Sequence, residues 1–144
     1  MSAGMNTVAV VLEGPERLAL SRVALSPPGE DDLVVDIEWS GISTGTERLL
    51  WNGTMPEFPG MGYPLVPGYE AVGRVVAAGD RSGRHVGDPV FGGGAHCFPD
   101  VRCLFGSTAR HLVVPGTRTH LLAPSLGDRA VLLALAATAY NALR

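Results

Sequence analysis

Glycine and proline divide this 144-residue chain into short segments, and this division restricts its possible folds more than any other feature. The sequence contains 19 glycines and 11 prolines, and many segments between them are apolar and rich in β-branched residues. Residues 7–12 are such a segment, which Gly14 and Pro15 bring to an end. Short strand-like segments at close spacing are typical of closed or nearly closed β barrels. The sequence therefore predicts a mainly β fold.

The clearest strand pattern lies at residues 33–42, where apolar and polar side chains alternate. Val35, Ile37 and Trp39 are expected on the buried face, with Asp36 and Glu38 on the other. The predicted strands are residues 7–12, 17–25, 33–42, 69–78 with an interruption at Gly73, the stretch entered by the turn at 86–90, 108–114 and 119–123.

Two segments have helical patterns. Residues 44–51 can form a short helix with Thr44 or Thr46 as the N-cap, and the chain is expected to be helical from Ser125 or Asp128 to its end. The second helix is apolar nearly all round, so it requires burial on more than one side. Its apolar residues include Val131, Leu132, Leu133, Leu135 and Ala136.

These patterns divide the chain into three parts. Residues 1–6 are expected to be a flexible arm or an artificial extension, and residues 7–124 a β domain with long loops at 52–67 and 92–106. Residues 125–144 are expected to begin a helix that leads to a further domain. The simplest explanation for so apolar a helix is that the natural protein continues beyond it.

Composition and charge exclude several classes of partner. The formal net charge of −3 gives no reason to expect nucleic acid or an anionic membrane. The longest apolar run, residues 130–139, is half of the roughly 20 residues that span a bilayer. No signal-peptide pattern is present, so a cytoplasmic location is expected. Cys97 and Cys103 have no usual zinc-site spacing, and free thiols are favoured over a disulfide or a metal shared with His96.

Five segments carry a family resemblance. They are WSGISTGTE (39–47), PGYEAVGRV (67–75), VGDPV (86–90), GSTARHLVVP (106–115) and LALAATAYNAL (133–143). In this order they resemble the GroES-like substrate domain of the medium-chain dehydrogenases and reductases. The resemblance covers residues 7–144. It implies a partly open β barrel with a C-terminal helix, without the Rossmann domain of the family.

The resemblance also implies a zinc-independent member. Zinc-dependent members have a cysteine where Ser43 stands and a histidine where Tyr69 stands, and neither hydroxyl is a good zinc ligand. Glu70 remains, but one carboxylate would hold zinc weakly. The four-cysteine structural zinc lobe is missing as well.

A narrower resemblance concerns members that act in bacteriochlorophyll synthesis. Residues 39–53, 58–76 and 132–140 resemble those members, which use NAD to oxidise the 3-(1-hydroxyethyl) group of a chlorin or bacteriochlorin macrocycle to 3-acetyl. NAD would be bound mainly by the absent domain, because no glycine-rich dinucleotide fingerprint opens a helix here. Gly92, Gly93 and Gly94 are followed by no helical pattern. The isolated chain is therefore expected to be inactive, and any homo-oligomer is expected only in the full-length protein.

The resemblance assigns site residues to the two active-site segments. Ser43, Tyr69 and Glu70 are expected to be catalytic, with Glu47 and His96 as alternative bases. The other interpretation of Ser43 and Tyr69 is that their hydroxyls are satisfied within the core.

Two further groups of residues are expected to contact ligands. Thr44 and Arg48 would face the cofactor, with Arg48 suited to a phosphate. Trp51, Met55, Phe58, Tyr63 and His96 are expected to bind the pigment, since aromatic and methionine side chains suit a large flat apolar ligand. Alternatively, the aromatic and methionine residues fasten a proline-rich loop onto the barrel.

Two other functions remain open at this point. One is a zinc-less quinone or enoyl reductase of the same superfamily. The other is a non-catalytic module that binds pigment.

Overall fold

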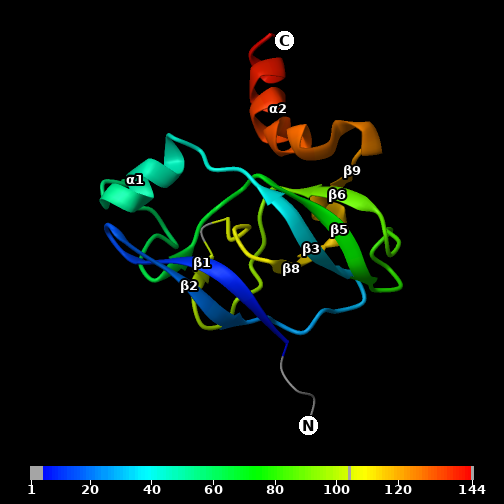
Figure 1. Ribbon diagram of the computed structural model, residues 1–144, viewed down its shortest axis with the longest axis horizontal. Helices are drawn as coiled ribbons and strands as arrows, with labels where there is room; N and C mark the ends of the chain where they lie inside the picture. The colour runs from blue at the N-terminus through cyan, green and yellow to red at the C-terminus, as the bar shows by residue number, and fades with distance from the viewer. Residues whose placement is uncertain (1–4, 104, 144) are drawn as a thin grey trace.

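The computed structural model describes residues 5–103 and 105–143, which form a curled, partly open β barrel with a helix at its C-terminal end (Figure 1). The mainly β fold with a C-terminal helix that the sequence predicts is confirmed. The strands are β1 (Asn6–Gly14), β2 (Arg17–Ala24), β3 (Asp32–Ser40), β4 (Leu65–Val66), β5 (Ala71–Ala78), β6 (Pro89–Gly92), β7 (Arg102–Cys103), β8 (His111–Pro115) and β9 (Thr119–Leu121). The helices are α1 (Thr46–Asn52) and α2 (Leu133–Ala142), with 3-10 segments η1 (Gly116–Arg118) and η2 (Pro124–Leu132).

The described residues form two sheets that a short segment holds together. One sheet has the strand order β2-β1-β4-β7, and the other has the order β8-β3-β5-β6-β9. The Val10 N–H donates to the Thr108 carbonyl (3.0 Å), and the Ile37 N–H donates to the Arg110 carbonyl (2.8 Å). Residues 108–110 therefore bond to a strand of each sheet, and this link curls the two sheets toward a barrel.

The main core lies between the two sheets. Ala9 and Val11 from β1 pack in one cluster with Leu33 from β3, Val75 from β5 and Leu112 from β8, all of them almost fully buried. Burial of apolar area is the dominant stabilising contribution in such a core. Alternate residues of β1 face this core, so Val8 and Val10 lie on its outer face.

The predicted burial of one residue of β3, Trp39, is wrong. The register of β3 against β5 shifts between Ile37 and Trp39, where two residues of β3 advance against one of β5. A bulge of this kind breaks the two-residue alternation, and Trp39 is 54% exposed instead of buried. The predicted interruption of β5 at Gly73 is also wrong, because Gly73 pairs within a continuous strand.

The two long loops are largely as predicted, but each contains a two-residue strand that the pattern did not indicate. Leu65 pairs with Arg102 and Val66 with Cys103, in parallel, and Leu65 also pairs with Leu12 of β1. These bonds attach both loops to the first sheet.

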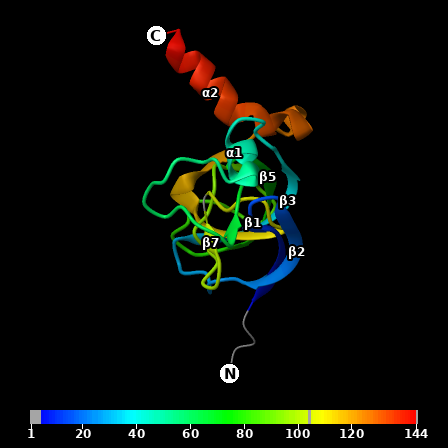
Figure 2. The same ribbon diagram turned by 90° about the vertical axis from the view of Figure 1, so that its left-hand side faces the viewer.

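The C-terminal helix begins later than predicted. Gly127 has φ 53° and ψ −137°, which interrupts the helical conformation, and η2 remains 3-10 up to Leu132. Helix α2 then extends away from the barrel (Figure 2), and none of its residues is buried. Ala130 of η2 is buried against Val72 and Phe91 of the second sheet, and Val131, Leu133 and Ala134 pack on the same cluster while partly buried.

At the other end of the chain, the last two residues of the predicted arm, Met5 and Asn6, are bonded to the fold or part of it. Asn6 already belongs to β1, and the Leu25 N–H donates to the Met5 carbonyl (2.8 Å). Residues 1–4 lie outside the described part of the chain. Among the described helices, none has the length and apolar character needed to cross a bilayer.

Candidate functional site

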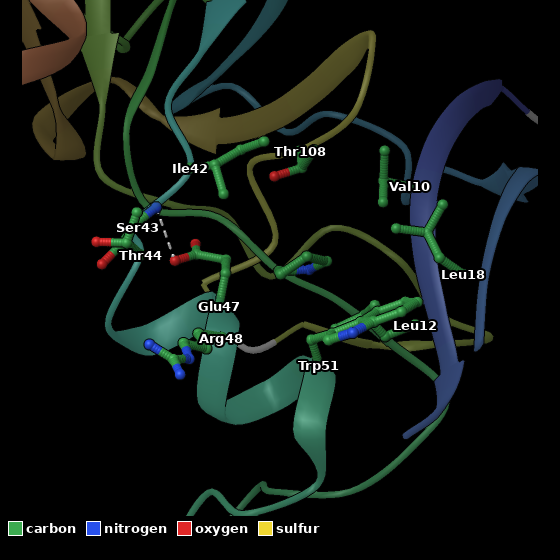
Figure 3. Close-up of a pocket in the computed structure, with 11 residues that line it drawn as sticks. Val10, Leu12, Leu18, Ile42, Ser43, Thr44, Glu47, Arg48, Trp51 and Thr108 are labelled. Atoms are coloured by element: carbon green, nitrogen blue, oxygen red, sulfur yellow. Dashed lines mark hydrogen bonds between the residues drawn. The ribbon is translucent and has the colours of Figure 1, made fainter. Parts of the chain in front are cut away.

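Helix α1 is held at its N-terminus by two reciprocal hydrogen bonds. The Thr46 N–H donates to Ser43 Oγ (3.3 Å), and the Ser43 N–H donates to Glu47 Oε2 (3.0 Å; Figure 3). This arrangement resembles a capping box, in which a hydroxyl and a carboxylate satisfy the free amides of a helix start. The predicted caps Thr44 and Thr46 are wrong, because the N-cap position is Gly45 and Ser43 supplies the side-chain acceptor.

A cavity of about 540 Å³ opens beside this helix start. Val10 and Leu18 of the β1–β2 hairpin form one wall, and Trp51 lies across the cavity floor, beside Leu12 (Figure 3). Its lining residues are Val10, Leu12, Leu18, Ile42, Ser43, Thr44, Glu47, Arg48, Trp51, Pro67 and Thr108. The lining of the cavity is thus mostly apolar, and Ser43 and Glu47 place a hydroxyl and a carboxylate at one of its edges.

Glu70 is a buried acid close to this edge. Only 4% of Glu70 is exposed, and its Oε1 is a buried oxygen without a hydrogen-bond partner in the described structure. Burial raises the pKa of the Glu70 carboxyl. Burial also raises the pKa of Glu47, with a smaller contribution from the charge of Glu70. The two carboxyls are therefore near enough to interact, and both hold a proton more readily than an exposed carboxyl does.

Tyr69 is a neighbour of Glu70 in the sequence but does not line the cavity. Its ring packs edge-on against Phe105, with ring centroids 5.1 Å apart. Thr44 and Arg48 do line the cavity, and their side chains point away from its apolar wall (Figure 3).

The predicted pigment-binding residues divide between two places. Trp51 lines the cavity beside α1, whereas Met55, Phe58 and Tyr63 line another cavity, of about 520 Å³, which shares no lining residue with the first. The Tyr63 hydroxyl donates to the Leu50 carbonyl. Met55 and Tyr63 also pack on a buried cluster that contains Leu50. These contacts favour the alternative interpretation, that the loop residues fasten the loop to the barrel.

The residues around His96 form no metal centre within the described chain, where no group of three or more potential metal ligands occurs. His96 is exposed and lines neither cavity. Cys97 and Cys103 are free thiols. Burial raises the pKa of Cys97 to about 11 and raises that of Cys103, so both thiols stay protonated at neutral pH.

Sequence reasoning missed the contribution of the hairpin to this site. Val10, Leu12 and Leu18 were assigned to strands without any functional role. The available signal was that residues 7–12 are apolar on both faces of the predicted strand. An apolar outer face is not needed for a barrel core alone, so it indicates a second contact surface.

A family model described as the alcohol dehydrogenase GroES-like domain matches residues 29–124. Two curated relatives are named 2-desacetyl-2-hydroxyethyl bacteriochlorophyllide A dehydrogenase. The protein of Rhodobacter capsulatus is 53% identical over 140 residues, and that of Cereibacter sphaeroides is 51% identical over 144 residues. Each match covers 96% of this chain and 45% of the relative, so the chain spans less than half of their length.

Solved structures share the fold. A cinnamyl alcohol dehydrogenase of Sorghum bicolor superposes with a TM-score of 0.72 at 20% identity, over 90% of this chain and 44% of the other. An Escherichia coli alcohol dehydrogenase complexed with NADH superposes with a TM-score of 0.68 at 22% identity, over 90% and 42% of the two chains. At this level of identity the likeness concerns the fold alone.

Proposed function

Since this chain belongs to the alcohol dehydrogenase GroES-like domain family, we propose that it is the substrate domain of an NAD-dependent dehydrogenase of bacteriochlorophyll synthesis. The enzyme would oxidise the 3-(1-hydroxyethyl) group of a bacteriochlorophyllide precursor to a 3-acetyl group. The observation that carries the proposal is the cavity beside α1, whose lining is mostly apolar and has Ser43 and Glu47 at one edge. The names of the two relatives that are more than 50% identical support the choice of substrate.

Oxidation of a secondary alcohol removes a hydride from carbon and a proton from oxygen. The nicotinamide cofactor, when bound, accepts the hydride. The proton requires a base within hydrogen-bond reach of the substrate hydroxyl. We assign this role to Glu47, because it lines the cavity and because a raised pKa makes its carboxylate a stronger base than an exposed one. The Ser43 hydroxyl would orient the substrate oxygen from the same edge.

Glu70 would act on the base rather than on the substrate. It does not line the cavity, and its charge raises the pKa of Glu47. The catalytic role of Tyr69 stays a prediction, and so does contact of His96 with the pigment.

Thr44 and Arg48 are suited to the cofactor side of the site. Both are exposed and lie on the rim of the cavity, next to Ser43 and Glu47. A guanidinium at this rim can pair with a phosphate of a dinucleotide.

The donor set present does not fit zinc. At the ligand position of zinc-dependent relatives, Ser43 Oγ accepts the hydrogen bond that caps α1, and the Tyr69 ring packs on Phe105. Structural and catalytic zinc sites use thiolate, imidazole and carboxylate ligands. We therefore propose a zinc-independent reaction, which predicts substoichiometric zinc in the purified full-length protein and unchanged turnover after chelation.

The proposal is tested by turnover of the full-length protein with 3-(1-hydroxyethyl)bacteriochlorophyllide a and NAD. The acetyl product is followed by its absorption, since a carbonyl conjugated to the macrocycle shifts its spectrum. Glu47→Gln should lower kcat by roughly 100-fold or more, the usual contribution of general acid–base catalysis. Glu13→Gln, at an exposed carboxylate that lines neither this cavity nor that of Phe58 and Tyr63, serves as the matched control. Full activity of Glu47→Gln would exclude Glu47 as the base.

The same assay separates the other candidate functions. Reduction of a quinone with no oxidation of the pigment would indicate a reductase, and binding of pigment without turnover would indicate a non-catalytic module.

A further inference from the structure

The outer face of the β1–β2 hairpin is an apolar sheet surface that is open to solvent. Val10 pairs with Leu20 across the two strands, and Leu12 pairs with Leu18. Leu18 is 54% exposed and Leu20 is 73% exposed. A contiguous group of apolar side chains with this exposure is typical of a surface that binds a ligand or a partner.

This face connects the cavity beside α1 with a further cavity, of about 470 Å³. The further cavity lies between the hairpin and the end of β3, and its apolar lining includes Val8, Leu20 and Trp39. Val10 and Thr108 line both cavities, so the two adjoin along β1. Together they form a trough that runs from Trp51 to Trp39.

The bulge in β3 has a consequence for this trough. It turns Trp39 outward, so the indole ring becomes a wall of the further cavity instead of part of the core. Aromatic faces at both ends of an apolar trough suit a flat, conjugated ligand, because stacked rings attract beyond the area that they bury.

The charged side chains of the trough near Trp39 already have partners. Arg74 Nε lies 2.9 Å from Glu38 Oε1, and Arg110 Nε lies 3.6 Å from Asp36 Oδ1. The side chains of both pairs are exposed, and each charge is balanced by its partner. No unpaired charge from these residues therefore faces Val10 and Leu20 on the apolar floor. Such a floor favours an uncharged ring over an ionic ligand.

We propose that this trough seats the whole tetrapyrrole macrocycle of the substrate. The edge that bears the hydroxyethyl group lies in the cavity beside α1, near Ser43 and Glu47, and the remainder of the ring lies over Leu20 toward Trp39. Ligand cavities usually span about 300–1,000 Å³ for drug-sized molecules, and a substituted tetrapyrrole is larger than most of these. The two adjoining cavities together match it better than either does alone. The identity of the ligand rests on the proposed function.

The test measures pigment binding by the full-length protein, followed by quenching of pigment fluorescence, independently of turnover. The double variant Val8→Ser, Leu20→Ser changes the trough at exposed positions remote from Ser43. Its matched control is Val76→Ser, Leu121→Ser, because these residues are 47% and 58% exposed, lie in strands and line neither cavity. The trough variant should bind hydroxyethyl bacteriochlorophyllide about tenfold more weakly, from the apolar contact that it loses. The control should bind as the unaltered protein does.

A smaller ligand separates the two parts of the trough. A secondary alcohol such as 1-phenylethanol fits within the cavity beside α1, so its KM should be equal in both double variants. If the trough variant and the control bind pigment equally well, the inference is overturned, and oxidation of the pigment by the unaltered protein would still support the proposed function. If the trough variant binds more weakly but the unaltered protein oxidises no pigment, the trough is supported and the proposed function is overturned. No binding of pigment by the unaltered protein would reject both.

Discussion

At the scale of single residues, the most unusual feature is a carboxyl buried without a hydrogen-bond partner for one of its oxygens. Glu70 Oε1 is in this state, and Gly41 lies so close that a Cβ at that position would be 2.5 Å from Glu70 Oε2. A residue larger than glycine at position 41 would therefore collide with the buried Glu70 carboxylate. Residues of this kind are common where a protein adjusts the pKa of a functional group.

The raised pKa of Glu70 predicts how stability changes with pH. In the unfolded chain the carboxyl has its ordinary pKa, so stability is lost as pH rises from that value through the raised pKa of the native state. Glu70→Gln cannot ionise, so this variant should unfold at a higher temperature than the parent at pH 7.5 and at no higher temperature near pH 4. Thermal unfolding at both pH values measures the difference. If the exposed control Glu57→Gln shows the same pH-dependent change in unfolding temperature, burial of Glu70 is not the cause of that change.

At the scale of elements, α1 depends on a residue that precedes it. Ser43→Ala removes the acceptor for the Thr46 N–H and should lower the free energy of unfolding by about 1 kcal/mol, the usual cost of a lost N-cap. Thr44→Ala is the matched control, since Gly45 and not Thr44 occupies the N-cap position. Chemical denaturation measures both. If the two variants lose equal stability, the cap assignment fails.

The elements also mark the limit of prediction from sequence. Strands with a local signal could be located: β1 is an apolar, β-branched run that Gly14 and Pro15 end, and β3 alternates between apolar and polar residues. The pairing of β4 with β7 could not, because it joins Leu65 to Arg102 across 36 intervening residues and each strand is too short to have a pattern. The kink before α2 depends on the φ of Gly127, which composition does not reveal.

The candidate site shows the same division between local and long-range information. Ser43, Thr44, Arg48 and Trp51 lie within nine residues, and they line one cavity because α1 carries most of this segment past it. Phe58 is only seven residues beyond Trp51, yet the chain turns at Gly53 and places it in a different cavity. The hairpin residues that complete the cavity are some thirty residues earlier in the chain, and only tertiary structure brings them there.

At the scale of the whole molecule, the trough on the hairpin and helix α2 are both apolar and exposed. They differ in what surrounds them. The trough adjoins a cavity with a hydroxyl and a carboxylate, whereas α2 extends from the barrel with no buried residue (Figure 2). The first therefore suits a small ligand that reaches the polar edge, and the second suits a protein surface that can cover a helix.

The sequence alone predicts a homo-oligomer only for the full-length protein, but the exposed apolar side chains of α2 and of the residue before it predict that the 144-residue chain also associates with itself. Leu132 is 53% exposed and Leu135 is 51% exposed, and an apolar helix requires burial on more than one side. Sedimentation velocity over a range of concentrations should reveal species larger than a monomer. Leu132→Gln, Leu135→Gln keeps good helix formers at both positions and should shift the distribution toward the monomer. The trough variant Val8→Ser, Leu20→Ser should leave association unchanged if α2 is the contact, whereas a shift in that variant alone would assign self-association to the hairpin instead.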